Sequence, residues 1–162
     1  MTAKNQIVKT SAEFNKVTVI GSKTGNMGNP TSIHTVFIAD ENGISLVFNE
    51  LKSKLADHPT DFLTLIYTTN QDEKLPLFKA ELTSLEKRLS HQLEIHYISI
   101  GSFTALDKTI LQETLEVVIN SNLSINMLFH VVGNGTLVEP TREQLSFLGI
   151  KQKQIKTQII IN

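Results

Sequence analysis

A strand-to-helix turn late in the chain has the residue types of a ligand-facing loop. The apolar run 127–132 breaks at Gly133, Asn134 and Gly135, and a helical pattern follows from about Thr136. Glycine lets the backbone approach a bound group and adopt a positive φ, and the first turn of a helix points N–H groups into the same space. The pattern therefore predicts a loop that faces a ligand.

Five apolar segments alternate with helical patterns, and this order predicts the fold. Near-continuous apolar runs are typical of strands buried on both faces, and strands that alternate with helices form parallel sheets. The expected fold is α/β, a three-layer doubly wound parallel sheet of about five strands. The expected strands cover residues 34–39, 62–67, 93–100, 127–132 and 155–161, and the helices begin near Gly43, Pro76, Leu106 and Thr136.

Polar residues follow several of these strands. In a doubly wound sheet the ligand crevice lies beyond the carboxyl ends of the strands. We therefore expect Asp40, residues 68–70, residues 101–102 and residues 133–134 to gather at one edge of the sheet.

Residues at the expected helix ends fit their positions. Pro76 suits the first turn of the second helix, and Asp107 could cap the third. Thr136 and Glu139 fit a capping box, and Gly149 fits a helix stop.

The composition argues against several classes of protein. The chain has 162 residues, 40% of them hydrophobic, and a net charge near −1, so it can build a core but does not favour nucleic acid as a partner. No apolar run approaches the roughly 18 residues of a membrane span, and the N-terminus lacks the apolar core of a signal peptide, so we expect a cytoplasmic protein. There is no cysteine, and the five histidines lack metal-ligand spacing, so no metal site is predicted.

Glu113 and Glu116 are expected on a solvated helix face.

Residues 127–149 resemble the last nucleotide-contacting loop of the ferredoxin reductase family of flavin oxidoreductases. That family has an apolar strand, then Cys-Gly-Pro-Pro, then a helix that ends in Leu-Gly. This chain has an apolar strand, then Val132-Gly133-Asn134-Gly135, then a helical pattern that ends in Leu148-Gly149.

Other segments are similar to further motifs of the family. The strand 35–39 with Gly43-Ile44-Ser45 resembles the phosphate loop, and Tyr67-Thr68-Thr69-Asn70 resembles Tyr-Gly-x-Arg, whose arginine pairs with ribose or its 2′-phosphate. Residues 155–160 resemble the terminal strand, and residues 21–27 resemble the last strand of the flavin-binding barrel.

The resemblance implies a division into two parts and a binding site. Residues 1–30, with a short strand at 17–20, would correspond to the end of a flavin-binding barrel, and residues 31–162 to an NAD(P)-binding domain. No catalytic or metal-binding residue is assigned. The implied cofactor-binding residues are Asp40, Asn42, Gly43, Ile44, Ser45, Thr68, Asn70, Gly133, Asn134, Gly135 and Thr136.

The chain departs from the family where the family keeps its chemistry. Val132 replaces the cysteine beside the nicotinamide, Asn70 the arginine, and Ile160 the aromatic residue that covers the flavin. Asp40 and Glu41 stand in a loop that is usually small and uncharged. A carboxylate about 4 Å from a pyrophosphate costs about 1 kcal/mol in water-like surroundings and about 4 kcal/mol in a partly buried crevice. We therefore expect weak NAD(P)H binding and no flavin on this chain alone, unless the two acids instead cap the helix themselves.

Two functions remain open at this point. The first is the nucleotide-binding half of a flavin oxidoreductase, impaired in hydride transfer, which needs a flavin-binding domain or an electron-transfer protein as partner. The second is a non-catalytic module that uses the same fold to bind another ligand or a protein. The chain could also form a homo-oligomer.

Overall fold

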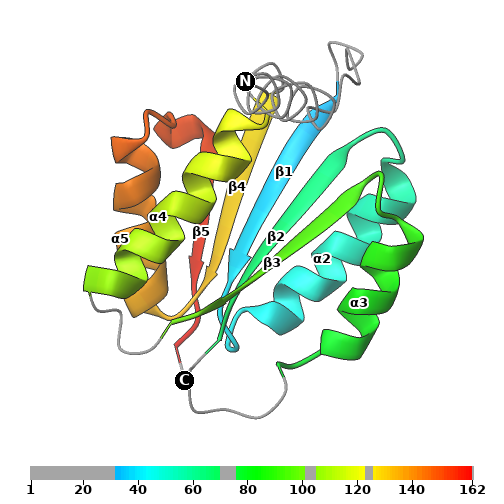
Figure 1. Cartoon of the computed structure of the whole chain (residues 1–162), viewed down its shortest axis with the longest axis horizontal. Helices are drawn as coiled ribbons and strands as arrows, with labels where there is room; N and C mark the ends of the chain where they lie inside the picture. Colours follow the sequence, from blue (N-terminus) through cyan, green and yellow to red (C-terminus); the bar gives the residue numbers. More distant parts are fainter. Residues whose placement is uncertain (1–31, 70–75, 101–104, 123–125, 162) are drawn as a thin grey trace, which may run out of the picture. The chain divides into compact units, whose positions relative to one another are not determined.

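The computed structural model describes residues 32–69, 76–100, 105–122 and 126–161. Figure 1 shows a sheet with helices on both faces. The barrel-like segment predicted at residues 1–30, its strand at 17–20 and the crevice residues at 101–102 lie outside the described residues and stay predictions.

The described sheet has five strands, and all of its neighbouring strands run parallel. The order across the sheet is β3-β2-β1-β4-β5. Since the chain moves outward from β1 in one direction and then returns to place β4 on its other side, the predicted doubly wound topology is confirmed. The strands are β1 Ile33–Ala39, β2 Phe62–Thr69, β3 Leu93–Ser99, β4 Asn126–Gly133 and β5 Ile155–Ile159.

Helices cover both faces of this sheet and complete the three layers. They are α2 Ile44–Asp57, α3 Lys79–Arg88, α4 Ala105–Asn120 and α5 Gly135–Phe147, with a short 3-10 turn, η1, at Gln152–Gln154. Among the described residues, no helix has the length and apolar character needed to cross a membrane.

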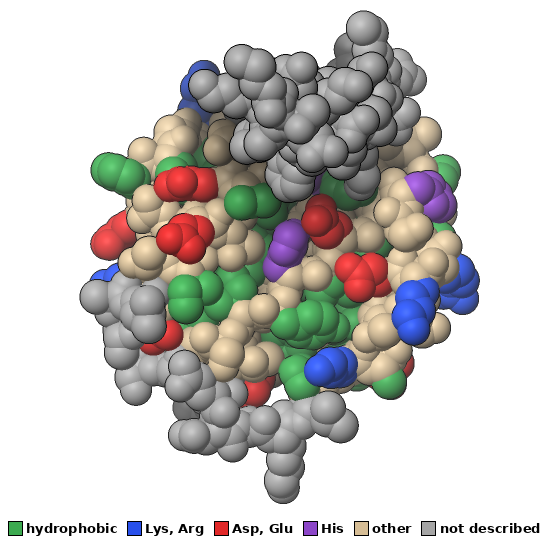
Figure 2. All heavy atoms as spheres, viewed as in Figure 1, with side chains coloured by type: hydrophobic (Ala, Val, Ile, Leu, Met, Phe, Trp, Pro, Cys, Tyr) green, Lys and Arg blue, Asp and Glu red, His purple; other side chains and the backbone are tan. Residues whose placement is uncertain are grey.

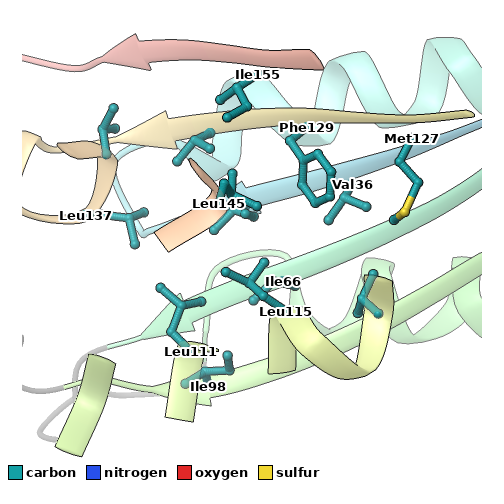
Figure 3. Packing of buried hydrophobic residues seen from close by; sticks show 14 of the residues in the cluster. Val36, Ile66, Ile98, Leu111, Leu115, Met127, Phe129, Leu137, Leu145 and Ile155 are labelled. Atoms are coloured by element: carbon teal, nitrogen blue, oxygen red, sulfur yellow. The ribbon is translucent and has the colours of Figure 1, made fainter. Parts of the chain in front are cut away.

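The core lies in two layers, one on each face. Along β1, Val36 and Ile38 point to one face while Phe37 and Ala39 point to the other, as the period of two in a strand requires. The layer under α4 and α5 draws side chains from every strand of the sheet (Figure 3). Its members include Val36, Ile66, Ile98, Leu111, Leu115, Met127, Phe129, Leu137, Leu145 and Ile155. The layer under α2 and α3 includes Phe37, Ile44, Val47, Phe48, Leu51, Leu63, Leu65, Tyr67, Leu82 and Val132.

The second helix begins later than Pro76 suggests. Lys79 is its first residue, and Phe78 before it takes the left-handed conformation with φ 60°. A bulky residue rarely adopts this region. The Phe78 ring is stacked on Phe48 with the ring centres 4.5 Å apart, and the Lys79 N–H donates to the Pro76 carbonyl. Pro76 therefore precedes a turn, and the helix follows that turn.

Two other capping predictions are wrong, and one is confirmed. The N-cap of α5 is Asn134, so Thr136 is already inside the helix, and Glu139 pairs with Arg142. Asp107 is likewise inside the first turn of α4 and buried, so it is not the N-cap residue. Gly149 does stop α5, because it takes φ 84° and the Ile150 N–H returns to the Leu145 carbonyl at 3.0 Å.

Two histidines are buried within the sheet. His34 is buried, and its Nε2 lies 2.8 Å from the Thr64 hydroxyl. Burial lowers the pKa of His34 to about 4, against a smaller opposing effect of Glu94. His130 is also buried, with Nδ1 3.0 Å from a carboxylate oxygen of Glu50 on α2, and burial lowers its pKa although Glu50 raises it.

Candidate functional site

The candidate site lies at the carboxyl ends of the two central strands. Ala39 of β1 is in register with Val132 of β4, so the loops that begin at Asp40 and Gly133 leave the sheet side by side. This is the point where the strand order reverses, which is where doubly wound sheets bind ligands. The structure thus brings the two predicted loops together.

Asp40 holds these two loops together through its carboxylate. One oxygen, Oδ1, accepts hydrogen bonds from the N–H groups of Asn42 and Gly43, both at 2.9 Å. The other oxygen, Oδ2, accepts from the N–H of Asn134, at 2.8 Å, across the crevice. The Asp40 carbonyl also accepts from Ile44, at 2.9 Å, and the residue as a whole is only 9% exposed. The negative charge at the start of α2 therefore comes from the protein itself.

Two glycines make this close approach of the loops feasible. A Cβ atom on Gly43 would lie 2.1 Å from the Val132 carbonyl oxygen, which no side chain permits. A Cβ on Gly133 would lie 2.6 Å from Cγ of Asp40. The carboxylate thus lies directly against the backbone of the glycine loop, in space that a larger residue at Gly133 would fill.

The start of α5 is capped separately. The Asn134 side chain accepts from the Leu137 N–H at 3.0 Å and from the Thr136 hydroxyl at 2.6 Å. Gly135 and Thr136 are exposed, and a Cβ on Gly135 would meet nothing within 4 Å. The start of α5 is therefore exposed, whereas N–H groups at the start of α2 are bonded to Asp40.

The end of β2 borders the site but turns its side chains inward. Thr68 is buried, and its hydroxyl donates to the Ala39 carbonyl at 3.2 Å. Tyr67 is fully buried, and burial followed by the charge of Glu41 raises its pKa to about 12, so the phenol stays neutral and cannot serve as a base at neutral pH. Asn70 lies outside the described residues, and its predicted contact with ribose stays a prediction.

The remaining predicted residues divide between core and surface. Ile44, the first residue of α2, is fully buried, whereas Asn42 and Ser45 are exposed. Of the predicted binding residues, the structure gathers Asp40, Gly43, Gly133 and Asn134 into one hydrogen-bonded or closely packed group. The sequence did not indicate that Asp40 joins both loops, since 94 positions separate it from Asn134.

Val132 stands where the resemblance places a cysteine, and its side chain is fully buried in the layer under α2. Ile160, in the position of the terminal aromatic residue, packs against the same layer. Neither side chain offers a group for redox chemistry.

Glu113 and Glu116 share a helix face, as predicted, and line a shallow groove of about 480 Å³ with Val117 on α4. Within the described part of the chain, no three histidine or acidic side chains gather into a metal-binding group. On the face shown in Figure 2, acidic and basic side chains are interspersed, with no broad patch of one sign.

Solved structures with the same fold include several reductases. Ferredoxin-NADP+ reductase from Plasmodium falciparum, solved with 2′P-AMP, superposes with a TM-score of 0.58 at 19% identity, over 84% of this chain and 55% of the reductase. The fold is ferredoxin reductase-like. The cytochrome b5 reductase region of human Ncb5or, in its NAD+ form, has a TM-score of 0.61 at 16% identity, over 78% of this chain and 36% of that one. The Amycolatopsis cytochrome P450 reductase GcoB has a TM-score of 0.59 at 12% identity, over 86% and 39%.

These likenesses concern the fold alone, because the identities are low. The chain spans about half the length, or less, of the structures it matches. No protein-family model matches the sequence, and no curated protein matches it either.

Proposed function

We propose that this chain is a divergent NAD(P)-binding domain of the ferredoxin reductase type, in which Asp40 occupies the position of a ligand phosphate. The observation that carries the proposal is the Asp40 carboxylate bound to the N–H groups of Asn42, Gly43 and Asn134. Backbone N–H groups at the start of a helix are a common phosphate site. In this chain the corresponding N–H groups already donate to the carboxylate of Asp40.

A dinucleotide would have to compete with this internal carboxylate. It would need the same N–H groups, and it would bring its own negative charge close to Asp40. At 4 Å the repulsion is about 1 kcal/mol in water-like surroundings and about 4 kcal/mol in a partly buried crevice, whereas a helix N-terminus returns at most about 1 kcal/mol per charge. We therefore expect NADH and NADPH to bind weakly.

The proposal includes impaired hydride transfer by the isolated chain. Val132 is enclosed in the core and cannot take the place of a cysteine beside a nicotinamide, and Ile160 cannot stack on a flavin as an aromatic ring does. A partner that supplies a flavin-binding domain would be required. We expect the purified chain to be colourless, and an absorbance spectrum with stoichiometric FAD or FMN would contradict this part of the proposal.

Calorimetric titration with NADH and NADPH tests the proposal. Asp40→Gly removes the internal anion and keeps both Gly43 and Gly133, so its affinity for both dinucleotides should exceed that of the wild type by roughly tenfold for each 1.4 kcal/mol of repulsion removed. Glu113→Gln is the matched control, since it removes one negative charge from the exposed face of α4 and should leave the affinity unchanged.

The outcome also separates the two candidate functions. Micromolar NADH binding by the wild type would overturn the proposed block and restore the active oxidoreductase as the leading function. If neither the wild type nor a folded Asp40→Gly variant binds dinucleotides, the fold serves a non-catalytic module with another ligand or a protein partner. The burial of Val132 and the internal pairing of Thr68 favour that second function, because both withdraw side chains from the crevice.

A further inference from the structure

The two edges of the sheet differ in how their outward N–H groups are used. On β3, the Leu93 N–H donates to the Leu89 carbonyl and the Ile95 N–H donates to a carboxylate oxygen of Glu86, each at 2.8 Å. Contacts of this kind keep an edge strand from pairing with another chain. The β3 edge is therefore partly protected by the helix next to it.

The β5 edge is less protected. The Ile160 N–H donates to the Gly133 carbonyl, so even-numbered residues of this segment face β4 and odd-numbered residues face away from the sheet. The outward N–H of Ile155 donates a hydrogen bond to the Gln152 carbonyl in η1. Within the described residues, the N–H groups of Thr157 and Ile159 have no acceptor.

The side chains at this edge are also accessible. Thr157 is exposed, and Ile159 is 46% exposed although it is apolar. α5 packs over one face of β4 and β5, and no described helix packs on the other face of β5 (Figure 1).

We infer that the β5 edge binds a second copy of the chain, with the two β5 strands antiparallel about a two-fold axis that passes between the two Thr157 residues. In this register Thr157 faces Thr157 of the second copy, and the N–H of Ile159 meets the carbonyl of Ile155. The interface is self-complementary, as a two-fold axis requires. The Ile155 N–H, which is already bonded within its own chain, needs no new partner.

The side chains match in the same register. Ile155 faces Ile159 of the second copy, Thr157 faces itself, and Lys156 faces Gln158. Pairs of β-branched residues and threonine pairs favour strand pairing, and no like charges stand opposite each other. The sequence of outward residues, Ile155, Thr157 and Ile159, reads the same in both directions. An unrelated segment would not require this symmetry, so the pattern favours a second copy of the chain.

The helices leave room for this pairing. Neighbouring strands lie about 4.8 Å apart. Because each α5 lies equally over β4 and β5, the two α5 helices would lie about 10 Å apart, at the upper end of the 8–10 Å between packed helices. The pairing joins the two sheets into one without a clash between these helices.

Sedimentation velocity on the full chain, over a dilution series, tests the inference. The wild type should show a monomer–dimer equilibrium. Thr157→Lys and Thr157→Glu each place like charges on the two-fold axis and should be monomeric, with the far-ultraviolet circular dichroism unchanged. An equimolar mixture of the two variants should dimerise again, because opposite charges then meet on the axis.

Ser99→Lys is the matched control, since it adds the same charge at an exposed position of the other edge strand and should leave dimerisation unchanged. A wild type that is monomeric throughout the series would overturn the inference. Dimers of Thr157→Lys as strong as those of the wild type would also overturn it, because the contact would then lie elsewhere.

Discussion

The two central strands continue into helices in different ways. The β1–α2 connection holds Asp40, Glu41, Asn42 and Gly43, and a carboxylate satisfies its helix and also binds the neighbouring loop. The β4–α5 connection is the single residue Asn134, whose neutral side chain caps its own helix. The start of α2 therefore has an internal anion, whereas the start of α5 has a neutral cap.

This difference separates two properties that usually occur together. The glycines and the strand register hold the two loops close together, and under the proposed function the charge of Asp40 between them opposes a nucleotide. Under the proposed function, the backbone geometry is kept without a ligand because the Asp40 carboxylate makes the contacts that a phosphate would make.

The largest expected effect comes from replacing a glycine with alanine in the β1–α2 connection. Gly43→Ala should cost about 4 kcal/mol of unfolding free energy or prevent folding, because its Cβ would lie 2.1 Å from the Val132 carbonyl oxygen. Chemical denaturation measures this. A loss below about 1 kcal/mol would mean that the two connections are not in close contact.

Lowering the pH should reduce the free energy of unfolding through the buried His34. The pKa of His34 is about 4 in the folded chain against 6.5 in the unfolded chain, so protonation favours unfolding. The contribution of His34 is fully present above pH 6.5 and falls by about 3 kcal/mol as the pH drops to 4. Denaturation across this range should show the loss, and His34→Gln should reduce it and leave the part that belongs to His130, whose pKa is also lowered by burial. An equally steep loss in the variant would assign the effect to other groups.

Asp40 should matter more for stability than Asn134. Asp40→Ala removes the acceptor of three N–H groups and should cost about 2 kcal/mol, whereas Asn134→Ala removes a single helix cap and should cost about 1 kcal/mol. Both are measured above pH 6.5, where His34 does not contribute to the pH dependence. Equal losses would show that the bond between Asp40 and the Asn134 N–H adds nothing.

The smallest effect is expected at the open start of α5. Gly135→Ala meets no atom within 4 Å and occupies a helical position, so it should leave stability unchanged or raise it by less than about 1 kcal/mol. It is the matched control for Gly43→Ala, and a clear loss would mean that the second connection is as crowded as the first.

Much of the fold could be predicted from the sequence, because its signals are local. Apolar runs such as 62–67 mark buried strands, and the alternation with helices fixes the parallel sheet. The start of α3 was predicted too early, since a stack between Phe48 and Phe78 holds an unfavourable backbone conformation that no local pattern indicates.

The site was predicted less completely. The sequence indicated that Asp40, Gly133 and Asn134 would lie near one crevice, and it raised self-capping as one role for the acid. It could not show that the carboxylate reaches Asn134, because that contact depends on the register of β1 and β4.

Residue-resolved amide NMR tests the central claim most directly. Titration of the wild type with NADH should leave the amide signals of Asn42, Gly43 and Asn134 in place, because Asp40 already binds these groups. The same titration of Asp40→Gly should move all three signals together. If NADH moves them in the wild type as well, Asp40 does not occupy the phosphate position, and the account is contradicted.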